Sequence, residues 1–539
     1  MNIGLISAEY DLSSNGLRLL SSVLKKYGHS VTLIFMPYFN NKYPRSVLKK
    51  LYALICRMDM IGFSSMALSS QKVIQIIKSI REKKFDGVII WGGIHATLNP
   101  DECLMYADYV CVGEGEFAFA ELAYALHTRK TGGRKIKNIR GRHSRVCKIR
   151  PLVMNLDSLP FEDYSLAGHL VLENGSFVPM QEKHFTYGLH NLSNEFFNKV
   201  RGSFVTIHCI RGCHSSCTYC CNYDLKKIYH IRLSGTTSHA SLLRKRSLGH
   251  VISQLRQLKK NIPSLAFVWF TDDDFFVRSR DEISAFIAEY KKHVALPFMC
   301  YAGPKSIEKT KLSMLVSAGL CRVEVGIQTG SRRVSSSLYN RKMANREILR
   351  AARTLNKFKT RMYPPEYQLI GTNPNETLKD IGETLKLIEA LPKPFFLRVF
   401  NLTYFPGSTY YKNALEDMHT KECALKSFTL EYGDTIGHFK IKTGSGHCLV
   451  LSLLQGQFNS IRYGKVPRFL FPLIKSSRGS NFAQKIFYLW LRVCPYNLIF
   501  VPFPYPLRAA YIRSYIFIYS RIYLPFSRTA SLIGKTKTR

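Results

Sequence analysis

Between residues 202 and 405 the sequence repeats one pattern, a short apolar run followed by a longer run with helical periodicity. The expected strands are 204–209, 266–271, 297–302, 322–328, 366–371 and 397–405. Helical patterns fall between them, including 249–260, 282–292, 307–318, 346–357 and 378–390. Six consecutive strand–helix units predict a partial (β/α)6 barrel of parallel strands, with its chemistry on the loops that follow the strands.

The loop after the first of these strands is rich in cysteine. Three of its cysteines have the spacing Cys213-x3-Cys217-x2-Cys220. Clustered thiolates repel one another and oxidise readily, so such a loop usually holds a metal ion or cluster. A zinc ion is one alternative, with a neighbouring cysteine or histidine as the fourth ligand. A four-iron cluster explains the spacing better, because three thiolates leave one iron open to a small chelating molecule.

Residues 1–127 also alternate strands and helices, but they precede the barrel and form a separate domain. The expected strands are 2–7, 31–36, 60–63, 88–91 and 109–112, and the expected helices are 17–27, 70–83 and 116–127. This order predicts a doubly wound, flavodoxin-like or Rossmann-like α/β domain, whose ligand crevice lies at the carboxyl ends of its parallel strands. The residues expected there are Ser64, Ser65, Gly92, Gly93, His95, Thr97, Gly113, Glu114 and Gly115. Small side chains at these places would let a bulky flat ligand approach the backbone, although each turn alone also suits an ordinary tight connection.

The chain is strongly basic, with a formal net charge of +40 from 77 basic and 37 acidic residues. No carboxylate follows Asp434, whereas sixteen Lys or Arg do. Such asymmetry predicts attraction to an anionic partner. Residues 484–526 combine aromatic residues with arginine, which suits either a packed helical cap or peripheral contact with an anionic membrane. The first residues resemble a strand and not an export signal, so we expect a cytoplasmic protein.

Four regions follow from these patterns. They are a doubly wound domain at 1–127, a linker or connector at 128–200, the partial barrel at 201–415 and a mainly helical, basic C-terminal region at 416–539. The linker assignment rests on the basic, glycine-rich composition of 128–150, which has little periodicity.

The cysteine motif, read as Cys213-x3-Cys217-x-Tyr219-Cys220 after the first strand of a six-unit barrel, resembles the signature of the radical S-adenosylmethionine (SAM) enzymes. The resemblance implies that the three cysteines hold a [4Fe–4S] cluster and that the open iron binds SAM. It also implies that Tyr219 lies beside the adenine, and that an external donor supplies the electron that cleaves SAM to a 5′-deoxyadenosyl radical.

Further motifs of that family follow at the ends of later strands. They imply SAM contacts from Asp273 after the second strand, and from Gln328 and Ser331 after the fourth. Gln328 stands where the family more often has glutamate, which could alter the contacts to SAM.

The N-terminal domain is similar to that of the cobalamin-binding radical SAM enzymes, because its strands end in Gly-Gly-Ile-His-Ala-Thr and Val-Gly-Glu-Gly-Glu. The similarity implies that the nine crevice residues named above bind cobalamin. The family's Asp-x-His-x-x-Gly signature lacks its histidine here, at 11–16. A histidine lower ligand from that position is therefore excluded.

The resemblance implies an enzyme that methylates an unactivated carbon of a small or lipid-linked biosynthetic intermediate. A cyclase or rearrangement enzyme that uses the same cofactors would carry the same motifs. A tRNA methylthiotransferase would need a second cluster of three cysteines, whereas Cys56, Cys103 and Cys111 are dispersed, so we expect no nucleic-acid substrate. The remaining alternative is a zinc-stabilised protein that binds membrane or nucleic acid through its basic tail.

Overall fold

The computed structural model of the chain describes residues 1–426, except 39–41, 129–135, 143, 145–146, 187–201, 232–241, 372 and 419. The basic segment from 427 onward, and with it the expected membrane contact, lies outside the described residues. Within the described part, every helix is too short or too polar to cross a lipid bilayer.

The N-terminal domain is built on an eight-stranded sheet with the order β6-β5-β4-β3-β1-β2-β7-β8. Its first five strands are β1 (Asn2–Ser7), β2 (Ser30–Phe35), β3 (Met60–Ser64), β4 (Val88–Gly92) and β5 (Tyr109–Cys111). The helices are α1 (Asn15–Lys26), α2 (Arg45–Ile55), α3 (Ser70–Glu82), α4 (Gly93–Leu98), α5 (Pro100–Leu104) and α6 (Glu116–His127). The pairs from β5 through β1 to β7 are all parallel. The expected doubly wound sheet is confirmed.

The order of the strands reverses at β1, which pairs with β2 on one side and β3 on the other. A reversal of this kind opens a crevice at the carboxyl ends of the two central strands. Two apolar layers cover the sheet, since side chains of α1 and α6 belong to one buried cluster and those of α2 and α3 to another. The crevice is therefore held on both sides by packed helices.

The segment expected to act as a linker contributes strands of its own to this sheet: β6 (Ile139–Gly141), β7 (Leu170–Glu173) and β8 (Ser176–Pro179). These strands have only three or four residues each, too few for a clear alternating pattern. The turn between β7 and β8 is Asn174-Gly175, and both residues have positive φ. Asn-Gly is a strong hairpin signal for this reason.

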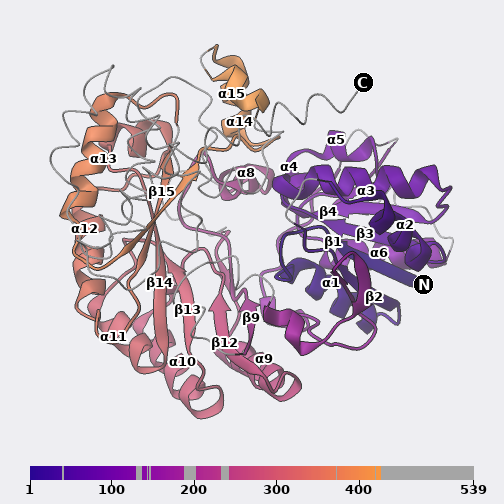
Figure 1. The fold of residues 1–539 in the computed structure, drawn as a ribbon, viewed down its shortest axis with the longest axis horizontal. Helices are drawn as coiled ribbons and strands as arrows, with labels where there is room; N and C mark the ends of the chain where they lie inside the picture. Colours follow the sequence, from indigo (N-terminus) through magenta and orange to yellow (C-terminus); the bar gives the residue numbers. More distant parts are fainter. Residues whose placement is uncertain are drawn as a thin grey trace, which may run out of the picture.

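The second sheet has six parallel strands in the order β9-β12-β13-β14-β15-β16, as the sequence predicts. The strands are β9 (Ser203–Ile207), β12 (Leu265–Phe270), β13 (Phe298–Ala302), β14 (Leu320–Gln328), β15 (Glu366–Gly371) and β16 (Phe396–Asn401). The helices are α8 (Cys221–Ile228), α9 (Leu248–Asn261), α10 (Arg280–His293), α11 (Lys309–Ser317), α12 (Asn345–Asn356), α13 (Leu378–Ala390), α14 (Thr409–Glu416) and α15 (Lys421–Lys426). Figure 1 shows α9 to α13 along the outside of the curved sheet.

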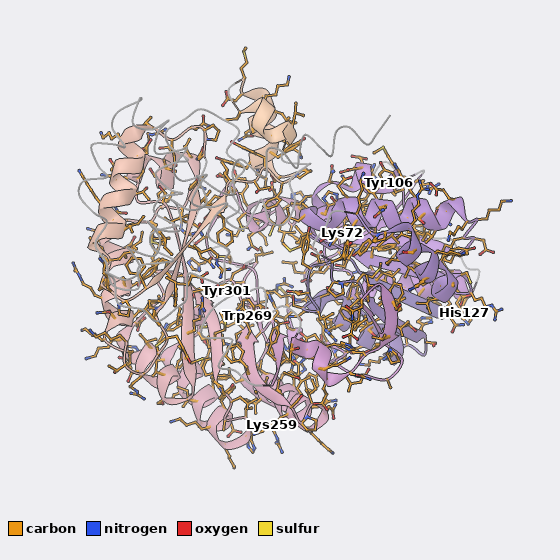
Figure 2. The ribbon with its side chains drawn as sticks, in the orientation of Figure 1. Lys72, Tyr106, His127, Lys259, Trp269 and Tyr301 are labelled. Carbon is orange, nitrogen blue, oxygen red and sulfur yellow. The ribbon has the colours of Figure 1, made fainter. Side chains whose placement is uncertain are left out.

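Aromatic packing fixes helix α10 on the barrel sheet. Phe286 of α10 lies 5.8 Å from Phe270 of β12 and 6.2 Å from Phe298 of β13, ring centre to ring centre, in edge-to-face geometry. Burial of each such side chain stabilises the fold by about 1.5–3 kcal/mol. On the same two strands, Trp269 and Tyr301 lie close together with ring centres 5.9 Å apart (Figure 2).

Candidate functional site

A cavity of about 700 Å³ lies where the N-terminal domain meets the barrel. The turns that follow β1, β3, β4 and β5 line it on one side. His208, Arg211, Cys221, Asn222 and Asp273 line it on the barrel side. Helix α8 approaches the N-terminal domain near α4 at this boundary (Figure 1). The cavity thus lies between the crevice and the cysteine loop that the sequence singles out.

The structure brings almost all the expected crevice residues to this cavity. Those that line it are Ser64, Ser65, Gly92, Gly93, Thr97, Gly113, Glu114 and Gly115. The exception is His95, which is 1% exposed and packs against Trp91 inside the domain. The nearest carboxylate oxygen that pairs with His95 is Glu102 Oε2, 3.5 Å from Nε2. His95 therefore belongs to the interior of the domain, away from the cavity.

The backbone of Gly93 explains how the crevice walls come so close together. Its φ is +89°, and a Cβ atom at this position would lie 2.7 Å from the backbone nitrogen of Ser65. Thr97 then ties the neighbouring turns, because its hydroxyl donates to Gly93 O over 2.8 Å and accepts from the Gly113 N–H over 3.0 Å. Only a glycine lets the turns after β3 and β4 approach this closely.

The cysteine loop connects β9 with α8, and an N–H group approaches each of its three motif sulfurs. The backbone N–H of Ser215 lies 3.4 Å from Cys213 Sγ. The other two donors are side chains: Arg341 Nη1 is 3.7 Å from Cys217 Sγ, and Asn222 Nδ2 is 3.7 Å from Cys220 Sγ. Hydrogen bonds to sulfur stabilise thiolates and help to set the potential of an iron–sulfur cluster. The three thiols thus fit the role of cluster ligands.

The same loop fits a single zinc ion poorly. Each Zn–S bond is about 2.3 Å, so the thiolates of one zinc ion lie within about 4 Å of one another. Among the residues that the structure describes, no group of three or more His, Cys, Asp and Glu side chains is arranged to hold one metal ion. A four-iron cluster bonds each thiolate through a different iron and needs wider spacing. The zinc alternative therefore finds no support in the described residues.

The three aspartates after β12 have different environments. Asp272 is fully buried and accepts from the backbone N–H groups of Cys209 and Ile210 over 2.6 and 2.7 Å, which fixes the start of the cysteine loop. Asp274 is also buried and accepts from the Ser306 hydroxyl over 2.8 Å; burial raises its pKa to about 6. Of the three, only Asp273 lines the cavity.

The other residues expected near SAM lie outside the lining of the cavity. Tyr219 lies within the cysteine loop, where its hydroxyl oxygen accepts from Arg341 Nη1 over 3.1 Å. Gln328 ends β14 with a φ of +65°. Ser331 is buried, donates to Asp380 Oδ1 over 2.6 Å and accepts from the Val334 N–H. The hydroxyl of Ser331 thus holds the turn before α12, and its contact with SAM stays a prediction.

Sequence reasoning missed two arginines that connect the halves of the site. Arg211 Nη1 lies 2.7 Å from Glu114 Oε1, and Arg244 Nη1 lies 2.8 Å from the same oxygen. Burial opposes the ionisation of Glu114, but the two guanidinium groups outweigh it and hold the pKa of this carboxyl below its ordinary value. The only signal in the sequence was the place of Arg211, two residues before the first motif cysteine.

Two family models match the chain, one on each side of the cavity. The B12 binding domain matches residues 1–123, and the Radical SAM superfamily matches residues 207–388. The chain is a radical SAM enzyme with an N-terminal B12-binding domain. In this enzyme the interdomain cavity lies between the two matched regions.

Solved structures give the same arrangement of domains. The radical SAM methyltransferase TsrM from Kitasatospora setae, with tryptophan substrate and the SAM analogue aza-SAM bound, is 16% identical with a TM-score of 0.57, over 77% of this chain and 76% of that chain. A second TsrM structure, with cobalamin and a [4Fe–4S] cluster bound, has the same identity and TM-score over 77% and 78% of the two chains. A sequence identity of 16% with a TM-score of 0.57 shows that the two proteins share a fold. None of the curated proteins compared with this enzyme matches it.

Proposed function

We propose that the enzyme is a cobalamin-dependent methyltransferase that acts on an unactivated carbon of a small molecule. In this proposal Cys213, Cys217 and Cys220 hold the [4Fe–4S] cluster, and the eight crevice residues that line the cavity hold cobalamin. When bound, the cluster supplies the electron that cleaves SAM, and cobalamin carries the methyl group. The observation that carries the proposal is the cavity that the B12-binding crevice lines on one side and the residues next to the motif cysteines, Gly212 and Cys221, line on the other.

The residues of the chain have defined tasks in this scheme. Asp273 presents a carboxylate to the cavity and is held by the side-chain amide of Asn222 over 2.9 Å. A fixed carboxylate beside the cluster loop suits the orientation of hydroxyl or amino groups of SAM or substrate. Arg341 supports the loop from the barrel side, because its guanidinium contacts both Tyr219 and Cys217 of the loop.

The fold of TsrM supports methyl transfer over the alternatives with the same cofactors. TsrM is a methyltransferase whose structure holds a tryptophan substrate, and its fold matches both domains of this enzyme. We extend only the reaction class to this chain, together with the expectation of a small-molecule substrate. A lipid-linked substrate would draw on the basic tail, which lies outside the described residues, and flotation of the full chain with anionic liposomes tests it.

The test is anaerobic incubation of the reconstituted enzyme with SAM, a strong reductant and cobalamin. We expect 5′-deoxyadenosine and S-adenosylhomocysteine, both abolished in the Cys213→Ala, Cys217→Ala, Cys220→Ala triple variant. Formation of 5′-deoxyadenosine without S-adenosylhomocysteine would favour a cyclase or rearrangement enzyme. Absence of both products from protein that carries about four irons would overturn the proposed function.

A further inference from the structure

One loop of the B12-binding domain is joined to the barrel by an unusual density of charged contacts. The guanidinium of Arg211 spans two carboxylates, with Nη1 2.7 Å from Glu114 Oε1 and Nη2 2.5 Å from Glu116 Oε1. Arg244 adds a contact of 2.8 Å to Glu114, and its side chain is only 4% exposed. Charge-assisted contacts of this kind are strong and directional when they are largely desolvated.

A neutral contact reaches the same loop from the other end of the cysteine segment. The N–H of Glu114 donates to the hydroxyl oxygen of Tyr229 over 2.9 Å. Tyr229 caps the end of α8, which begins at Cys221 directly after the last motif cysteine. Gly113 has a φ of +83°, and the Tyr229 hydroxyl occupies the place of its missing Cβ. The loop thus binds residues just before the first motif cysteine and at the end of the helix that follows the last one.

We propose that these contacts couple the two cofactor sites energetically, with Arg211 as the positioning residue that transmits the coupling. The inference rests on the proposed function. A cluster bound to the cysteine loop fixes Arg211, which in turn orients the carboxylates of Glu114 and Glu116 beside the cobalamin crevice. Since binding free energies are linked, bound cobalamin must stabilise the cluster by the same factor. Couplings of this kind are typically 5- to 150-fold, and we expect about tenfold here.

The N-terminal domain holds the loop independently, so that loss of Arg211 should not unfold it. Glu114 Oε2 accepts from the Val153 N–H over 2.9 Å, and Glu114 O accepts from Asn138 Nδ2 over 2.8 Å. Both partners belong to the N-terminal half of the chain. The loop can therefore keep its place in the domain while the link to the barrel is removed, and the coupling can be measured separately from folding.

The experiment is a titration of the full-length protein with hydroxocobalamin, with and without the reconstituted cluster. In the unchanged protein the cluster should tighten cobalamin binding about tenfold. In Arg211→Gln the ratio of cobalamin affinities with and without the cluster should fall towards one, while the affinity of the cluster-free protein for cobalamin changes little. Arg211→Lys should restore part of the ratio, and Arg140→Gln, which removes an arginine–aspartate pair within the N-terminal domain, should keep all of it.

The reverse measurement is the rate at which a chelator removes iron. Bound cobalamin should slow iron loss in the unchanged protein and slow it much less in Arg211→Gln. The coupling alone is overturned by either of two results. One is saturable cobalamin binding with the same affinity whether or not the cluster is present. The other is an equal ratio of the affinities with and without the cluster in Arg211→Gln and in the unchanged protein. Absence of saturable cobalamin binding in both forms overturns the proposed function and the coupling together.

Discussion

The side-chain amide of Asn222 lies 2.9 Å from Asp273 Oδ2 and 3.7 Å from Cys220 Sγ, so one donor group connects the cavity carboxylate with a motif sulfur. Asn222→Leu removes this donor and keeps a side chain of similar size. We expect unchanged iron content but a more negative reduction potential, because hydrogen bonds to sulfur raise the potential of iron–sulfur clusters. A redox titration followed by electron paramagnetic resonance measures it.

The matched control for this change is Asn345→Leu, which removes an amide that donates to Gly330 O over 2.8 Å, away from the thiols. Its potential should equal that of the unchanged protein. If Asn222→Leu also leaves the potential in place, the amide has no influence on Cys220.

The adjacent cysteines Cys220 and Cys221 should differ completely in their effect on the cluster. Cys220→Ala removes one of three expected ligands, and we expect loss of most iron and labile sulfide after anaerobic reconstitution. Cys221→Ala removes a thiol that lines the cavity and contacts Cys220 but is not one of the three expected ligands, so this variant should retain about four irons. Iron and sulfide analysis of both variants checks the assignment; equal iron content in the two would refute it.

Gly93 should tolerate alanine poorly because of its φ of +89° and its contact with the Ser65 backbone. The left-handed conformation alone costs a residue with a Cβ about 1–2 kcal/mol, and the displaced turn should also weaken cobalamin binding. Gly249→Ala in α9 is the control, because its Cβ meets open space and should stabilise the helix by up to about 1 kcal/mol. Urea unfolding and hydroxocobalamin titration compare the two, and similar stability losses would contradict this account.

Glu376 should make stability depend on pH. Burial, together with the nearby Asp380, raises the pKa of Glu376 from its ordinary value of 4.5 to about 8. The folded protein therefore binds this proton more tightly than the unfolded chain, and the resulting stability is full below about 4.5 and lost as the pH rises through about 8. Each unit of pKa difference corresponds to at most about 1.4 kcal/mol.

Glu376→Gln lacks this titration. As the pH rises from 4.5 to 8, the free energy of unfolding of the variant should therefore increase relative to that of the unchanged protein. Urea unfolding at several pH values measures the difference. Glu82→Gln, at an exposed site at the end of α3, controls for the loss of a surface charge. A difference that stays constant with pH would show that Glu376 is not held protonated.

Much of the fold could be predicted because local patterns determine it. The expected ranges 2–7, 116–127, 366–371 and 378–390 coincide with β1, α6, β15 and α13. Other elements were missed: helix α2 was not expected, and the β7–β8 hairpin lies in the segment expected to be a linker or connector, despite its Asn174-Gly175 turn. Strands of four residues, such as β7 and β8, have too few side chains to show a clear period.

The candidate site was predictable where it depends on spacing and hidden where it depends on long-range contacts. The cysteine loop and the small residues of the crevice could be read from the sequence. The pair of Arg211 and Glu114 joins residues 97 positions apart, and no local pattern marks such a contact. His95 illustrates the opposite error, since its place in the turn suggested the crevice while packing against Trp91 holds it inside.

Strand β9 has a consequence for how this protein is made. It is an edge strand that pairs only with β12, and it precedes every other strand of its sheet in the chain. A ribosome therefore releases the cysteine loop before its neighbouring strands exist, and at 5–20 residues per second the rest of the barrel takes on the order of ten seconds or more to emerge. By then the preceding domain has been synthesised, and its Glu114 and Glu116 offer the nascent Arg211 a docking point. The start of the cysteine loop can thus dock on the first domain before the rest of its own sheet has been made.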